Sequence, residues 1–219
     1  MFKFFGFILC LCLSLQMQAA NGVFMVVKGD VKVSVGGKAE SSAKVGTKVN
    51  AGDMIVTGTD SRAKIVMSDR NIINLSPNTK LKIESYVNDG KSKNVNLSLL
   101  EGKVRNNVEQ KYDNDKNKFE IRTPTAVAGV RGTQFITSYD GASQKTEVIT
   151  LQGQVELRNL APTTGAAKEE KVLVEKGEKS TVASGGAAPE PPQKMPPETL
   201  KEVDRDTTVK NKENLALLN

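Results

Sequence analysis

Residues Thr123–Phe135 have the sequence TPTAVAGVRGTQF, which sets a single arginine, Arg131, among glycines and small apolar residues. Pro124 fixes its own φ and biases Thr123 toward extended geometry. Gly132 permits backbone conformations or close approaches that a side chain would block. The small apolar neighbours indicate that this segment packs inward and carries Arg131 with it.

A buried Arg131 requires a partner, because an unpaired buried charge is strongly destabilising. The guanidinium either joins a carboxylate or carbonyl cluster that holds the fold, or binds an anionic ligand. The small apolar neighbours favour the structural role. Replacement of Arg131 with methionine separates the two, since a structural role lowers the melting temperature and a ligand role leaves folding intact.

Working outward from this segment, apolar and polar residues alternate with the period of two that is typical of half-buried strands. No stretch between residues 21 and 183 has a sustained helical period. About a dozen short strands predict an all-β fold, a single compact domain of the sandwich, jelly-roll or irregular solenoid type. The strand candidates are Val31–Val35, Ala63–Met67, Ile72–Leu75, Leu81–Glu84, Val95–Leu99, Lys118–Arg122, Thr133–Tyr139, Glu147–Leu151, Val155–Arg158, Lys171–Glu175 and Lys179–Val182.

Glycines punctuate these strands in two ways. Gly36-Gly37, Asp89-Gly90 and Asp140-Gly141 are hairpin signals between alternating segments. A second pattern places glycine next to a polar residue at the start of a strand. It predicts a recurring turn in which glycine supplies a positive φ and the valine that follows is the first buried residue of the strand. Its members are Gly29–Lys32, Ala51-Gly52-Asp53, Gly102–Arg105, Gly153–Glu156 and Lys176-Gly177-Glu178.

The N-terminus, residues 1–20, is typical of a secretory signal peptide. Lys3 precedes an apolar run of 12 residues, Phe4–Leu15, and small residues follow at Ala19-Ala20. Twelve residues are too few to span a bilayer. We therefore expect a mature chain without a transmembrane segment, located in the periplasm or secreted.

The predicted mature chain contains no Cys, His or Trp. This composition excludes disulfides, thiolate and imidazole metal sites, and nucleophile–histidine catalysis. Loss of Lys3 leaves 30 basic and 25 acidic residues, interspersed along the chain, with six aromatic residues. Nucleic-acid binding requires a concentrated basic surface or stacking aromatics, so we expect no nucleic-acid partner. We also expect no cofactor, no metal and no enzymatic activity.

Two groups of polar and acidic residues are candidate sites. Asp113, Asp115 and Asn117 have the first spacings of a calcium loop, but Lys118 and Pro124 stand where that loop needs Gly and Glu. A solvated connection between strands is the better interpretation. The second group is Asp53, Asp60 and Asp69, which are expected to accept hydrogen bonds from backbone N–H groups in turns rather than to converge on a cleft.

The composition changes after Ala183. Residues 184–197 are rich in Pro, Gly and Ala and predict an extended linker. Residues 198–219 are charged with sparse apolar positions, which predicts a tail that is disordered or forms a short helix starting after Pro197.

The chain closely resembles the FecR-type domain, named for the ferric-citrate regulator, in the order of Gly29–Val33, Val45–Gly58, Ser61–Met67, Leu75–Leu81, Leu99–Val104, Thr123–Phe135, Gly153–Val155 and Gly177-Glu178. Its most specific part is the signature formed by Thr123, Pro124, Val130, Arg131, Gly132, Thr133 and Phe135, which Gly52 and Asp53 accompany. The resemblance covers residues 21–183. It implies a β-rich periplasmic domain used in sensing and protein–protein contact.

In the regulators that name this family, an anti-sigma segment and one membrane helix precede the domain, and a receptor-contacting region follows it. This chain has a signal-like segment and a short tail in those places. We therefore expect a non-enzymatic binding module of the cell envelope without the anti-sigma role. The alternative is a structural envelope or matrix protein that binds glycan or cell wall through polar β-faces, and the third is a carboxylate-based hydrolase.

Overall fold

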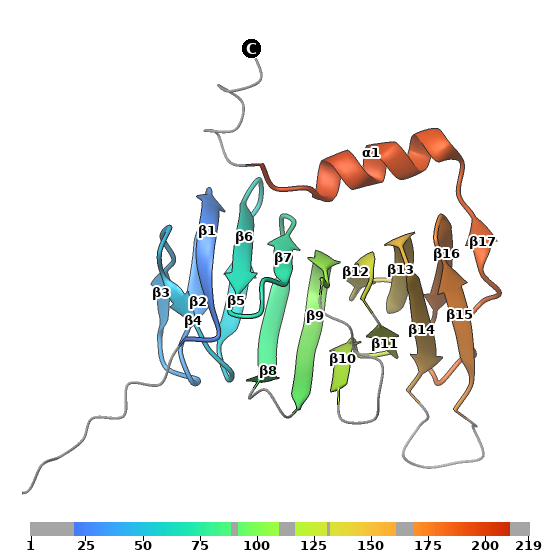
Figure 1. The fold of residues 1–219 in the computed structure, drawn as a ribbon, viewed down its shortest axis with the longest axis horizontal. Coiled ribbons are helices and arrows are strands. Elements are labelled where there is room, and N and C mark those ends of the chain that lie inside the picture. Colours follow the sequence, from blue (N-terminus) through green and yellow to red (C-terminus); the bar gives the residue numbers. More distant parts are fainter. Residues whose placement is uncertain (1–19, 89–91, 110–116, 131, 161–168, 211–219) are drawn as a thin grey trace, which may run out of the picture.

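The computed structural model describes residues 20–88, 92–109, 117–130, 132–160 and 169–210 as seventeen strands and one helix. The strands form two sheets stacked face to face, and the order of the strands largely follows the chain from one end of the molecule to the other (Figure 1). The all-β fold predicted from the alternation is confirmed. The predicted signal peptide, apart from Ala20, lies outside the described residues.

The first sheet, sheet A, runs in the spatial order β4 (Lys48–Val49), β1 (Gly22–Lys28), β6 (Arg62–Met67), β7 (Ile72–Leu75), the second half of β9 (Lys93–Asn107), β12 (Gln134–Asp140), β13 (Lys145–Gln152), β16 (Glu178–Val182) and β17 (Gln193–Lys194). The second sheet, sheet B, runs in the order β3 (Glu40–Ser42), β2 (Val31–Ser34), β5 (Met54–Thr57), β8 (Lys80–Asn88), the first half of β9, β10 (Asn117–Arg122), β11 (Ala126–Val130), β14 (Gln154–Asn159) and β15 (Lys171–Glu175).

Strand β9 belongs to both sheets. Its first half pairs with β8 and, in parallel, with β10, whereas Gly102–Asn107 pairs with β12. The chain changes sheets around Gly102, whose φ is +88°. A Cβ at this position would lie 2.5 Å from the Asn78 carbonyl oxygen and 2.6 Å from the Thr79 Cα. Glycine is therefore required here both by the backbone conformation and by the close approach.

Every described crossing between the two sheets contains a residue with positive φ. This confirms the predicted turn, and it adds Asp60 and Asn78, two of the residue types that best tolerate the left-handed region. The residues are Gly29, Gly46, Gly52, Asp60, Asn78, Gly102, Gly132, Gly153 and Gly177.

One apolar core fills the space between the sheets. The inward positions of the predicted alternating strands belong to it, among them Val31, Leu81, Leu97 and Leu157. The core is continuous from Phe24 on β1 to Val182 on β16. A single core along the whole length explains how an elongated sandwich holds together as one body.

The count of about a dozen strands was too low. The strands that the alternation did not predict are β1, β3, β4, β5, β11 and β17. Strand β11, the sequence AVAGV, is buried at four of its five positions, and a continuous apolar run carries no alternation. The pairings of β2 with β3, β8 with β9 and β12 with β13 confirm the three predicted hairpins, although residues 89–91 lie outside the described part.

The C-terminal segment contains the helix α1 (Pro197–Thr207), which is the short-helix alternative of the prediction. Proline occupies the start of the helix, as expected. In Figure 1 α1 runs back from β17 over the side of the molecule where the sheet A strands lie. Residues 211–219 are outside the described residues. No helix in the described part is long and apolar enough to cross a membrane.

Candidate interaction surfaces

The first residues of the signature form the turn between β10 and β11. Thr123 N–H donates to the Ala126 carbonyl at 2.9 Å, and the Thr123 hydroxyl accepts from Ala126 N–H at 3.0 Å. Pro124 is exposed at the tip of this turn. The hydroxyls of Thr123 and Thr125 both contact the Thr146 hydroxyl, at 2.6 and 2.7 Å. Because Thr146 lies on β13, this buried threonine cluster joins the turn in sheet B to sheet A.

The second half of the signature returns the chain to sheet A. Val130 is in the core, and Thr133 is buried with its hydroxyl donating to the Gln154 carbonyl at 2.9 Å. Gly132 has a φ of +67° at the crossing. Phe135 is fully buried. Arg131 lies outside the described residues.

Gly52 and Asp53 form the crossing between β4 and β5. The buried Asp53 carboxylate accepts from Asn50 N–H at 2.8 Å and from Gly36 N–H at 3.3 Å. The expected role in backbone capping is confirmed for Asp53. Gly52 has a φ of +90°, and its N–H donates to the Ile83 carbonyl at 2.7 Å.

The other acidic candidates are in separate places. Asp60 is an exposed turn residue, and the buried Asp69 accepts from the Tyr86 hydroxyl at 2.6 Å and from the Asn71 amide at 2.9 Å. Asn117 accepts from Lys93 N–H at 3.0 Å at the start of β10. Asp113 and Asp115 lie outside the described residues. The described residues contain no group of three or more His, Cys, Asp or Glu side chains placed to hold a metal ion.

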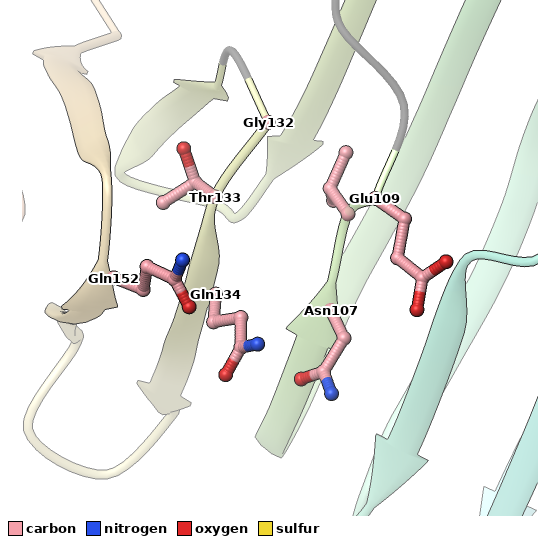
Figure 2. A pocket seen from close by; sticks show the side chains of 7 residues that line it. Asn107, Glu109, Gly132, Thr133, Gln134 and Gln152 are labelled. Carbon is pink, nitrogen blue, oxygen red and sulfur yellow. The ribbon is translucent and has the colours of Figure 1, made fainter.

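Three carboxamides form a row on the outer face of sheet A, beside the signature. Gln134 is in register with Asn107 on β9 and with Gln152 on β13. Figure 2 shows Gln134 between the other two side chains. These residues line a hollow of about 240 Å³ together with Val108, Glu109, Gly132 and Thr133. This row cannot be recognised in the sequence, because the amides come from three strands and only the register brings them together.

Arg105 connects this row to the helix. Its Nε donates to Asn107 Oδ1 at 3.2 Å and its Nη2 to Gln134 Oε1 at 3.4 Å. Its Nη1 donates to the Asp204 carboxylate and to the Asp204 carbonyl of α1. Since Arg105 engages the oxygens of both amides, the donors that Asn107 and Gln134 present to the hollow are their NH2 groups.

Another candidate surface is the edge of sheet B at β15. Among the described residues β15 pairs only with β14. Asn159 N–H donates to the Glu170 carbonyl, so the alternation of antiparallel pairs directs the backbone groups of Lys171 and Leu173 away from β14. The Leu173 side chain is 47% exposed. The strand was predicted, but its place at an edge depends on the topology and is absent from the local sequence.

The fold and these surfaces define the chain as an all-β, two-sheet sandwich domain with exposed polar and edge-strand surfaces. Residues 53–156 match the family model described as FecR protein. Residues 53–156 therefore form a FecR-type domain. The match runs from Asp53 through the whole signature to Glu156 on β14.

Among solved structures, the fold is similar to two crystal structures of a "putative anti-sigma factor" from Parabacteroides distasonis, at 1.65 and 2.50 Å resolution. The TM-scores are 0.51 and 0.52 at 16% sequence identity. The similarity covers 68% of this chain and spans 62% of the other. At this identity the likeness establishes the shared fold. The comparison with curated protein sequences gives no match.

Proposed function

We propose that this chain is a non-enzymatic binding module of the cell envelope, periplasmic or secreted, which acts through protein–protein contact. The observation that carries the proposal is the edge of β15, which pairs with no strand other than β14 in the part of the chain that the structure describes. Outward backbone groups at Lys171 and Leu173 can pair with an added strand, and the exposed Leu173 side chain offers an apolar contact.

The sequence of this edge favours pairing with a specific partner strand over unspecific aggregation. The charged residues Lys171 and Glu175 flank the apolar centre of the strand, as in natural edge strands that avoid unspecific association. The other outermost strands, β3, β4 and β17, have only three, two and two residues. Because a short strand offers few backbone groups, β15 is the edge best able to hold a partner strand.

Site-specific photo-crosslinking in living cells tests this role. A photoreactive residue at position 173 should give a discrete crosslinked product, whereas the same residue at Val45, an apolar side chain that is 65% exposed and belongs to a turn, should give none. Leu173→Lys should remove the partner from crosslinks formed at neighbouring positions. Identical product patterns at both positions would contradict a partner at β15.

A separate experiment tests whether the chain is periplasmic or secreted. Release of the chain by osmotic shock, with a mature N-terminus near residue 21, is the expected result. Deletion of residues 1–20 should retain the chain in the cytoplasm. Recovery of the unprocessed chain with cytoplasmic markers would exclude the periplasmic and secreted assignment.

The carboxamide row favours a second candidate function, the binding of glycan or cell-wall polymer. Amide side chains are suited to hydroxyl-rich ligands because they both donate and accept hydrogen bonds. Co-sedimentation with purified cell-wall polymer, compared between the unaltered chain and Gln134→Ala with Gln152→Ala, tests it. Equal sedimentation of both proteins, or none above control, would remove this candidate.

A further inference from the structure

A row of residues on the outer face of sheet A is buried although it lies outside the core. Asn74, Arg105, Ile136 and Ile149 follow one another in register across β7, β9, β12 and β13. They are 4%, 7%, 1% and 5% exposed, and none belongs to the core cluster. We call these four residues the covered row.

Helix α1 lies over this row with one face. Leu200, Val203, Asp204 and Thr207, at spacings of three, four and seven, are its less exposed residues. A Cβ built on Gly177, just before β16, would lie 4.0 Å from Leu200 Cδ2. The Leu200 side chain therefore lies close to this part of sheet A. Beyond the helix, Val209 is buried and its N–H donates to Asn74 Oδ1 at 3.4 Å. The spacing is that of an amphipathic helix on an apolar surface.

Two arginines of the sheet hold two aspartates of the helix. Arg105 pairs with Asp204, and Arg62 on β6 pairs with Asp206 at 3.0 Å. The Arg105 side chain is 8% exposed, whereas those of Asp204 and Asp206 are 50% and 60% exposed. The cationic part of the contact is thus built into the sheet, and the anionic part lies on the surface.

Arg105 is positioned by the sheet itself. Its bonds to Asn107 and Gln134 come from residues of sheet A and do not involve the helix. The guanidinium therefore keeps its orientation when α1 leaves, and it then exposes a donor group that needs an anionic partner.

The helix has little stability of its own. It has 11 residues and no side-chain hydrogen bond at its N-cap, Pro196. A helix this short is marginal in water unless it packs against another surface. Part of its attachment comes from partly exposed ion pairs, which contribute modestly and are weakened by salt.

We propose that the covered row, together with Arg62, is a receptor surface for an acidic amphipathic helix, and that α1 is its intramolecular occupant. The partner that fits is a protein helix with two carboxylates two residues apart and an apolar residue directly before the first, the pattern of Val203, Asp204 and Asp206 in α1. Such a helix competes with α1 for the same arginines and isoleucines. This surface is independent of the β15 edge, so neither proposal depends on the other.

A labelled peptide with the sequence of residues 196–210 tests the proposal against the full chain, with fluorescence anisotropy as the readout. The unaltered chain should bind it weakly, because α1 occupies the surface. The chain with Asp204→Asn and Asp206→Asn should bind it about tenfold more tightly, since its own helix holds less well. A peptide that carries the same two substitutions should bind the aspartate-substituted chain about tenfold more weakly than the unaltered peptide does.

Variants of the sheet identify the surface. In the chain with the two aspartate substitutions, Arg62→Gln and Arg105→Gln should each weaken peptide binding. Lys32→Gln, on β2 of sheet B, should leave it unchanged. Arg62 is 28% exposed, so its variant reports on binding even where Arg105→Gln impairs folding. Equal peptide affinity of the unaltered and the aspartate-substituted chain, or equal binding of the two peptides, would overturn the proposal and leave α1 a fixed part of the fold.

Discussion

The rings of Phe119 and Phe135 meet edge to face, with their centroids 6.3 Å apart and their planes at 88°. Phe119 belongs to β10 in sheet B, and Phe135, the last residue of the signature, belongs to β12 in sheet A. The pair therefore joins the two sheets through the middle of the core. Such aromatic pairs add to the stability gained from burial alone.

Truncation of this contact should destabilise the whole domain. We expect Phe135→Ala to lower the free energy of unfolding by about 3–5 kcal/mol, because it removes a fully buried ring and leaves a cavity. Phe135→Leu should cost about 1–2 kcal/mol and keep the protein folded for measurement. Urea denaturation checks both values. Val45→Ala, at an exposed turn, should change stability by less than about 0.5 kcal/mol, and a similar loss there would refute a specific role for the ring.

Two buried threonines on neighbouring strands should respond in opposite directions to the same substitution. Thr146 bonds the hydroxyls of Thr123 and Thr125, whereas the Thr137 hydroxyl has no hydrogen-bond partner among the described residues. Thr146→Val should cost about 1–3 kcal/mol, since it leaves two buried hydroxyls short of a partner. Thr137→Val should be neutral or stabilise by up to about 1 kcal/mol, because an unpaired buried hydroxyl is lost. Equal losses in thermal denaturation would show that the threonine cluster adds nothing.

The sequence predicted the parts of this fold that depend on local patterns. The alternation of Val95, Leu97 and Leu99 predicts the first half of β9, and the glycine before Lys103 predicts a turn with positive φ at the point where β9 changes sheets. The alternation does not predict strand β11, because both of its faces are covered and its sequence lacks alternation. A local period of two therefore does not identify a strand such as β11, which is covered on both faces.

The candidate surfaces were less predictable, because each depends on register or topology. Asn107, Gln134 and Gln152 are far apart in the sequence and form a row only when β9, β12 and β13 pair. Leu200, Val203 and Thr207 have a helical spacing that could have been noticed, but nothing local indicates that Arg105 lies beneath them. The ion pair between Arg105 and Asp204 joins residues 99 positions apart.

Stability should also depend on pH through Glu84 on β8. The hydrogen bond from Lys82, at 2.7 Å, and a further one with Ser98 hold the pKa of the Glu84 carboxyl below its usual range. A carboxyl with a depressed folded-state pKa stabilises the fold above its unfolded pKa, and this contribution is lost as the pH falls through the folded value. The drop in melting temperature between about pH 6 and about pH 3 should therefore be smaller in Glu84→Gln.

Lys82→Gln supplies the control for this pH effect. It removes the main cause of the shift, so it should reduce the same drop, and the double variant should show little further change because the two residues act as a pair. Additive effects of the two substitutions would indicate that Glu84 and Lys82 act on stability separately.

Two glycines with the same φ separate steric crowding from backbone strain. Gly46 and Gly102 both have a φ of +88°. A Cβ at Gly46 would meet nothing within 4 Å, whereas at Gly102 it would meet Asn78 and Thr79 at 2.5–2.6 Å. Gly46→Ala should cost about 1–2 kcal/mol, the strain of a left-handed alanine. Gly102→Ala should cost about 3 kcal/mol or more, because β9 must also move away from the start of β8. Urea denaturation of both variants measures the difference, and equal losses would show that β9 can change sheets without a close backbone approach at Gly102.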